Sequence, residues 1–189
     1  MNQEHLEGLR SDAWATFLES DLLPWVLDEA DLGSRVVEVG PGPGRTTDIL
    51  HTRFDQLRAV EIDEQLATEL RDRFAERSGV TVHHGDGAAM PFDDGSFTGA
   101  CCFIMLHHVP TADHQDRLFE EVARVLGPNS TFVGADAIAS DDLAARHVDD
   151  TFNPVDPSTL SDRLERAGFT DVVVSERPGL FKFRARTPA

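Results

Sequence analysis

Short apolar runs alternate along the chain with longer stretches in which apolar residues recur at helical spacing. The apolar runs predict strands at 35–39, 57–62, 80–84, 97–103 and 131–136. The amphipathic stretches predict helices at 44–52, 65–77, 113–126 and 157–167. Because strands alternate with helices, the pattern predicts an α/β fold with a parallel, doubly wound sheet.

The two ends of the chain depart from this alternation. The last two predicted strands, 171–176 and 180–186, have no helix between them and should pair as an antiparallel hairpin. Apolar residues from Leu6 to Leu32 predict two helices, with a break between Asp21 and Pro24 and an end at Gly33. These helices could cover one face of the sheet or part of a ligand site, and the first interpretation is favoured.

The chain is expected to form a single domain over residues 1–189. Residues 1–33 would supply the N-terminal helices, and residues 34–136 the ligand-binding core. Residues 137–189 would supply a partly helical connection, one further helix and the C-terminal hairpin.

Composition narrows the range of partners and compartments. With 17 Lys and Arg against 34 Asp and Glu, the formal net charge is −17. Since binding to a phosphate backbone depends on Lys and Arg, nucleic acid is not an expected partner. The adjacent Cys101 and Cys102 cannot form an ordinary structural disulfide, which favours a reduced compartment. No secretory leader or bilayer-spanning run is present, so a soluble, cytoplasmic protein without a membrane partner is expected.

Residues 36–63 read as a strand, a glycine-rich turn, a helix and a second strand that ends on Glu61. This order is typical of a βαβ unit that holds a nucleoside-containing ligand. Ligands of doubly wound sheets bind outside the carboxyl ends of the strands, where the strand order reverses. One crevice should therefore contain residues 40–44, Glu61, Asp86 and Phe103.

The carboxylates around this crevice discriminate between nucleotide ligands. The glycine spacing fits neither a phosphate-binding loop nor the dinucleotide fingerprint, because Arg45 replaces a required lysine or glycine. Glu38, Glu61 and Asp86 would repel a pyrophosphate. They suit a ligand with an ammonium group, a ribose diol and an adenine amine. S-adenosylmethionine has these groups and a sulfonium cation, and it has no phosphate.

The chain resembles the class I S-adenosylmethionine-dependent methyltransferases of the small-molecule type. The resemblance extends from Val36 to Asp136. It is carried by motifs at 36–44 (VVEVGPGPG), 59–63 (AVEID), 84–97, 105–109 (MLHHV) and 117–130. It implies a mostly parallel seven-stranded sheet of order 3-2-1-4-5-7-6, with S-adenosylmethionine as cofactor and S-adenosylhomocysteine as product.

The resemblance also implies roles for individual residues. It places the methionine part of the cofactor near Glu38, Gly40, Pro41, Gly42 and Gly44. It assigns the ribose hydroxyls to Glu61, the adenine ring to Ile62 and Gly87, the adenine amine to Asp86, and the remaining wall to Phe103 and Ile104.

Methyl transfer is an in-line displacement that depends mainly on positioning, and it needs a base only when the acceptor is protonated. His107 and His108 are the candidates, with His107 slightly preferred; a capping role for the pair is the favoured alternative. No metal is expected. Asp136 could supply one carboxylate after the fifth strand, but residues 103–105 supply none after the fourth. His147 and Asp150, three residues apart, are too few for a site.

The expected acceptor is a small molecule whose identity the sequence does not give, and the sequence leaves open whether the protein is a homodimer. Two alternatives to a methyltransferase remain. One is a protein that binds S-adenosylmethionine or a protein partner without turnover. The other, less favoured, is a nicotinamide-dependent oxidoreductase.

Overall fold

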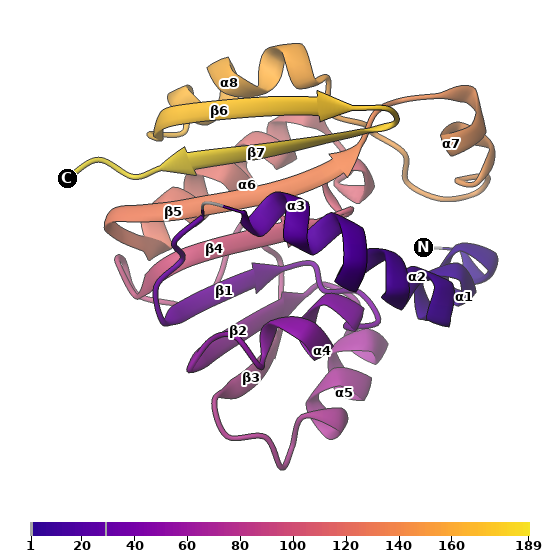
Figure 1. Cartoon of the computed structure of the whole chain (residues 1–189), viewed down its shortest axis with the longest axis horizontal. Coiled ribbons are helices and arrows are strands. Elements are labelled where there is room, and N and C mark those ends of the chain that lie inside the picture. Colours follow the sequence, from indigo (N-terminus) through magenta and orange to yellow (C-terminus); the bar gives the residue numbers. More distant parts are fainter. Residues whose placement is uncertain (1, 29) are drawn as a thin grey trace.

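A computed structural model describes residues 2–28 and 30–189. Its sheet has seven strands in the order β3-β2-β1-β4-β5-β7-β6, as the resemblance implied (Figure 1). The strands are β1 (Arg35–Val39), β2 (Gln56–Glu61), β3 (Val80–His84), β4 (Phe97–Phe103), β5 (Leu126–Ala137), β6 (Thr170–Arg177) and β7 (Leu180–Arg186). β7 runs antiparallel to both of its neighbours, β5 and β6, so the expected C-terminal hairpin is confirmed.

Strand order reverses at β1, which pairs in parallel with β2 on one side and β4 on the other. The carboxyl ends of these strands therefore open at one edge of the sheet, where a ligand site is expected. Figure 1 shows α1, α2 and α7 near this edge, at the right of the view.

Helices cover both faces of the sheet. On one face lie α4 (Arg45–Leu50), α5 (Glu64–Arg73) and the N-terminal helices, packed over residues such as Leu57 and Cys101. On the other face lie α6 (Ala112–Val125) and α8 (Pro157–Arg166), packed over Val37 and Cys102. Successive strand residues face opposite sides, so the two free, buried cysteines belong to two different cores.

The N-terminal segment differs from the predicted pair of helices. It forms α1 (Gln3–Arg10), α2 (Asp12–Phe17), the π-helical turn η1 (Leu18–Leu22) and α3 (Leu23–Leu27). The break lies at Ser11, whose hydroxyl accepts a hydrogen bond from the N–H of Trp14 and caps α2. No break occurs at Asp21–Pro24, because η1 runs directly into α3 and Pro24 lies in the first turn of α3 with helical backbone on both sides. The last of these helices ends at Leu27, well before Gly33.

Other differences concern element ends. β5 begins at Leu126, directly after α6, five residues before the predicted strand. Within the predicted connection a short helix forms, α7 (Asp141–Ala145), capped by Ser140. Asp156 caps α8, and its side chain accepts a hydrogen bond from the N–H of Ser158. Among the described residues, no helix combines the length and the apolar character needed to cross a bilayer. A cytoplasmic location stays a prediction.

Candidate functional site

A cavity of about 430 Å³ lies at the carboxyl ends of β1, β2, β3 and β4. This volume is in the range of small-ligand sites in proteins. Nine residues that the sequence assigned to the site line it: Gly40, Pro41, Gly42, Glu61, Ile62, Asp86, Gly87, Phe103 and Ile104. Glu38, Gly44 and His107 do not line it. The described strand ends therefore converge on one cavity, as the doubly wound fold predicts.

The glycine-rich loop between β1 and α4 forms one wall. Gly40, Gly42 and Gly44 all have positive φ values, of 66°, 57° and 79°. Residues with a Cβ rarely adopt this conformation, so the loop depends on glycine. Gly44 is the N-cap of α4, and its hydrogen atom packs against Leu70 and Arg73 of α5. The loop thus brings backbone close to the cavity and joins α4 to α5.

Replacing Gly44 with alanine should destabilise the fold by about 2 kcal/mol, from positive-φ strain and overpacking. A Cβ there would lie 2.5 Å from Nη2 of Arg73 and closer still to Cδ2 of the buried Leu70. Urea unfolding measures the loss. Gly8→Ala is the matched control, because the helical Gly8 has open space around a Cβ and should gain slight stability. Equal stabilities of the two variants would contradict this account of the loop.

Glu61, at the end of β2, ties two loops together. One carboxylate oxygen accepts from the N–H of Gly42 at 2.8 Å, and the other accepts from the N–H of Asp63 at 2.9 Å. Burial raises the pKa of Glu61, and the two backbone hydrogen bonds oppose that shift. Each carboxylate oxygen keeps a further lone pair, so the fixed carboxylate can still accept from a diol.

Glu38 lies beneath the glycine loop and away from the cavity wall. Its side chain is 1% exposed and accepts hydrogen bonds from the hydroxyls of Thr46 and Thr47, the second at 2.7 Å. Burial raises its pKa to about 7, even though these hydrogen bonds favour the charged form. The structure therefore gives Glu38 the position of a support for α4 and the loop, and its contact with a cofactor stays a prediction.

Asp86, in the loop after β3, faces the cavity with His114 of α6. Its oxygens lie 2.9 and 3.1 Å from Nε2 of His114, and one also accepts from the N–H of Ala88. The side chain is partly exposed, so it can accept a further donor from a ligand. The sequence motif predicted Asp86, whereas His114 lies 28 residues further along and carries no local signal.

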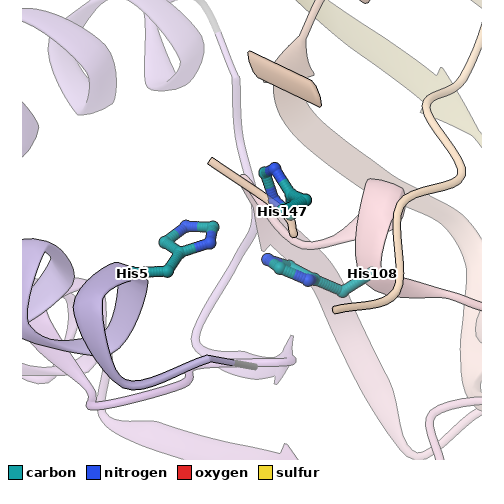
Figure 2. Close-up of side chains that lie close together, drawn as sticks. All are labelled: His5, His108 and His147. Carbon is teal, nitrogen blue, oxygen red and sulfur yellow. The ribbon is translucent and has the colours of Figure 1, made fainter. Parts of the chain in front are cut away.

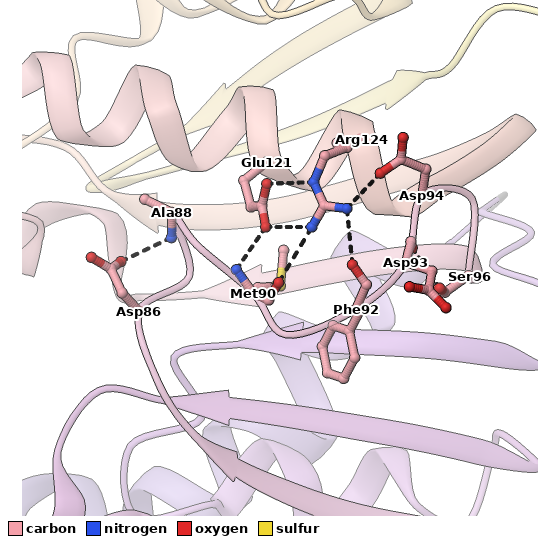
Figure 3. Close-up of polar contacts among 9 residues, drawn as sticks. All are labelled: Asp86, Ala88, Met90, Phe92, Asp93, Asp94, Ser96, Glu121 and Arg124. Carbon is pink, nitrogen blue, oxygen red and sulfur yellow. Dashed lines mark hydrogen bonds and ion pairs between the residues drawn. The ribbon is translucent and has the colours of Figure 1, made fainter.

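The loop from Asp86 to Ser96 is held by two residues of α6 (Figure 3). The guanidinium of Arg124 donates to the carbonyls of Met90 and Phe92 and to the carboxylates of Asp94 and Glu121. Glu121 accepts in turn from the N–H of Met90, and its hydrogen bond with Arg124 lowers its pKa. This pair fixes the loop that carries Asp86, although neither residue lines the cavity.

Arg124→Ala should accelerate amide hydrogen exchange in residues 88–96 roughly tenfold, because several loop hydrogen bonds depend on one guanidinium. S-adenosylhomocysteine should bind several-fold more weakly, since the loop carries Asp86. Arg117→Ala, on the exposed face of the same helix, is the control. Unchanged exchange in the Arg124 variant would show that the loop is held by other contacts.

An apolar wall completes the cavity. Ile62 is 64% exposed, unusually high for a large aliphatic side chain next to buried Glu61. A planar ring bound beside Glu61 would cover it. On the opposite side, Ile104 follows β4 with a φ of 52°, which is strained for a β-branched residue. Such strain persists where surrounding contacts fix the backbone, and here the N–H of Ile104 donates to the carbonyl of Ala135.

The two histidines after β4 have different environments. His107 is fully buried, with its backbone N–H on Oδ2 of Asp136 and its Nδ1 2.5 Å from Oδ1. Burial alone would lower its pKa, but the charge and hydrogen bond of Asp136 outweigh burial and raise it. His108, by contrast, lines the cavity. The preference for His107 over His108 as a base is therefore not supported, because Asp136 holds His107 inside the fold.

His108 is itself a poor base. Burial, together with the charges of His107 and His5, lowers the pKa of His108 to about 3. Burial, with the charges of His147 and His107, lowers the pKa of His5 to about 4. Because a base works best with a pKa near the working pH, His108 contributes little as a proton acceptor at pH 7.

Several wall residues come from segments that sequence motifs did not mark. They are Leu9, Trp14, Pro110, His114, Asp150 and Thr151. The N-terminal helices therefore do both things that the sequence allowed. α3 packs on one face of the sheet, and Leu9 and Trp14 cover part of the cavity. The amphipathic pattern of residues 6–32 could signal burial, but it could not say which apolar residues face the sheet and which a ligand.

A family model described as "Methyltransferase domain" matches residues 37–134, more than half of the chain, and the chain belongs to this family. The match confirms the methyltransferase class that the resemblance implied. The matched region contains the glycine loop and every wall residue contributed by β2, by β4 and by the loops after β2, β3 and β4.

Solved structures share the whole fold at low identity. A SAM-dependent methyltransferase from Aquifex aeolicus has a TM-score of 0.76 and 18% identity, with 98% of each chain covered. A phosphoethanolamine N-methyltransferase from Haemonchus contortus, solved with S-adenosylhomocysteine, has a TM-score of 0.76 and 14% identity. That match covers 90% of this chain and 53% of the other.

Among curated relatives, "Ribosomal RNA small subunit methyltransferase A" of Acidobacterium capsulatum is 51% identical over 57 residues. The match covers 30% of this chain and 20% of that protein. The chain spans between 20% and 35% of the length of the curated relatives it matches. These relatives contradict the expectation that nucleic acid plays no part. Net charge describes the whole surface and says nothing about a local contact, so it could not support that exclusion.

The cavity fits the expected cofactor, S-adenosylmethionine, which the family and its neighbours support. Glu61 offers fixed acceptors for a diol, and Asp86 offers one for an amine. Ile62 offers an exposed apolar surface for a ring. The glycine loop lets its backbone come close to a ligand. The space beside Gly42 is open, because a Cβ there would meet no atom within 4 Å, and glycine leaves that space free.

Proposed function

We propose that the chain transfers the methyl group of S-adenosylmethionine to a small-molecule acceptor within the cavity. The observation that carries the choice of methyl donor is Glu61, whose carboxylate bridges the loops after β1 and β2 on the cavity wall. Glu61 would bind the ribose diol, Asp86 the adenine amine, and Ile62 the adenine face. The glycine loop would hold the methionine part.

In this proposal the protein accelerates the reaction mainly by alignment. The acceptor heteroatom forms its bond to the methyl carbon while the sulfonium sulfur takes the electron pair of the breaking bond, which leaves S-adenosylhomocysteine. Holding donor and acceptor in line removes most of the entropic barrier. Leu9 and Trp14 line the cavity from the N-terminal helices and would exclude water from the acceptor side.

A second candidate acceptor is a ribosomal RNA base, and the printed name of the curated relatives favours it. The match covers 30% of this chain, and one cofactor-binding fold serves many acceptors. An RNA base could enter the cavity only after leaving its stack, because the site is concave.

Incubation with methyl-labelled S-adenosylmethionine tests the proposal and separates the two acceptors. One arm offers a metabolite extract and the other offers ribosomal RNA. Label in a small molecule supports the first candidate, and label in RNA alone supports the second. Thermal shifts run in parallel: S-adenosylhomocysteine should stabilise the chain, whereas stabilisation by NAD alone would sink the proposal. Stabilisation without labelling in either arm would favour the binding protein without turnover.

A further inference from the structure

Three histidines from distant parts of the chain meet beside the cavity (Figure 2). His5 comes from α1, His108 from the 3-10 turn after β4 (η2, Leu106–His108), and His147 from the turn after α7. One ring nitrogen of each lies within 4.8 Å of the others. Figure 2 shows the rings turned toward one another. His147 is buried and the other two are partly buried.

Hydrogen bonds fix the segments that carry the three histidines and orient the ring of His147. Asn2 donates to Asp150 through its backbone, and to the carbonyls of Arg146 and Val148 through its side chain. These bonds fix the start of α1 against the turn that carries His147. Nδ1 of His147 lies 2.8 Å from the carbonyl of Leu143. A carbonyl can only accept, so Nδ1 carries the proton and Nε2 presents its lone pair.

His107 lies behind the three rings, with ring centroids 4.3 Å from His108 and 4.9 Å from His147. Five buried ring nitrogens of the four histidines have no hydrogen-bond partner within the described residues. A buried polar atom without a partner loses its hydrogen bonds to water and gains none in return. Four packed imidazoles with so many unpartnered nitrogens are therefore unfavourable unless something binds them.

We propose that His5, His108 and His147 bind one divalent transition-metal ion of the zinc type. Imidazole ligands suit Zn²⁺, Co²⁺, Ni²⁺ and Cu²⁺, and sites with three protein ligands keep a position open. The carbonyl that orients His147 is the outer partner that metal-bound histidines usually have. Tetrahedral Zn–N bonds place ligand nitrogens about 3.4 Å apart, so binding draws the three rings together.

The open position of the ion would face the cavity, because His108 is both a ligand and a wall residue. An acceptor hydroxyl or thiol that binds there would lose its proton to water more readily, since a metal ion lowers the pKa of bound groups. Its heteroatom would then attack the methyl carbon. This consequence rests on the proposed function, whereas metal binding itself does not.

Cobalt titration of the full-length, chelator-treated protein tests the site. We expect one Co²⁺ per chain, visible absorption bands of a four- or five-coordinate ion, and displacement by Zn²⁺ but not by Mg²⁺. His5→Gln, His108→Gln and His147→Gln should each weaken Co²⁺ binding at least tenfold. His51→Gln, at the end of α4, is the matched control and should bind as the unchanged protein does.

Failure of the metal site can be separated from failure of the cofactor site. His5 and His147 do not line the cavity, so their variants should keep the thermal shift with S-adenosylhomocysteine. The proposal is overturned if the unchanged protein binds no Co²⁺, or if all three variants bind it normally. Should a variant not fold, the Co²⁺-loaded unchanged protein must show paramagnetically shifted ring protons from all three histidines, and their absence would also overturn it.

Discussion

Glu61→Gln should weaken S-adenosylhomocysteine binding roughly 100-fold, equivalent to about 2.7 kcal/mol. Both carboxylate oxygens accept backbone hydrogen bonds, from Gly42 and Asp63. A glutamine amide would place its NH₂ group against one of these N–H donors. The variant would therefore lose a link between the two loops as well as an acceptor for the ribose diol. Isothermal titration with S-adenosylhomocysteine measures the change.

Glu64→Gln is the matched control for this prediction, because Glu64 undergoes the same chemical change three residues away at an exposed position of α5. Its affinity should equal that of the unchanged protein. An affinity of Glu61→Gln within threefold of the control would place the cofactor elsewhere in the cavity.

Glu38→Gln should stabilise the protein at alkaline pH. Burial raises the pKa of Glu38 from 4.5 to about 7, so the folded state holds a proton that the unfolded state releases between these pH values. The folded state therefore loses stability as pH rises, by up to about 3 kcal/mol above pH 7 and not at all below about pH 4.5. Glutamine keeps hydrogen bonds to the rotatable hydroxyls of Thr46 and Thr47 and removes this penalty.

Urea unfolding at about pH 5.5 and about pH 8 should show the stability gap between Glu38→Gln and the unchanged protein widen by about 2 kcal/mol. The unchanged protein must be measured beside the variant, because His5 and His108 also make stability depend on pH. Their lowered pKa values make the stability of the fold rise with pH, as these groups deprotonate in the unfolded state. Both proteins share that slope, so it cancels. A constant gap across this range would mean that Glu38 ionises normally in the fold.

Such a penalty suggests a functional reason for an acid beneath the glycine loop. A carboxylate that is costly in the free protein gains a favourable partner when a cation binds nearby. We therefore expect Glu38→Gln to gain stability and lose affinity for the cationic S-adenosylmethionine more than for neutral S-adenosylhomocysteine. Equal losses for the two ligands would assign Glu38 a purely structural role.

The sequence determined the sheet and the half of the site that lies on it. Alternating apolar runs and amphipathic stretches specify strands and helices locally, and the handedness of parallel connections leaves few arrangements. Since the carboxyl ends of parallel strands meet at one edge, the glycine turn, Glu61 and Asp86 had to converge. The spacing of the βαβ unit at residues 36–63, together with the turn after the third strand, carried this information.

Only the tertiary structure decided the rest of the site. Whether Glu38 lies on the cavity wall or under it depends on the path of α4, and which of His107 and His108 faces the cavity depends on Asp136, 29 residues further along.

The cluster of His5, His108 and His147 is the part of the structure that local sequence patterns predict least. His5 and His108 are more than 100 residues apart in sequence, and His108 and His147 nearly 40. Local spacing pairs only His147 with Asp150 and predicts no metal. Side chains from three segments meet only when the chain has folded, because long-range contacts follow from packing and leave no periodic mark on the sequence.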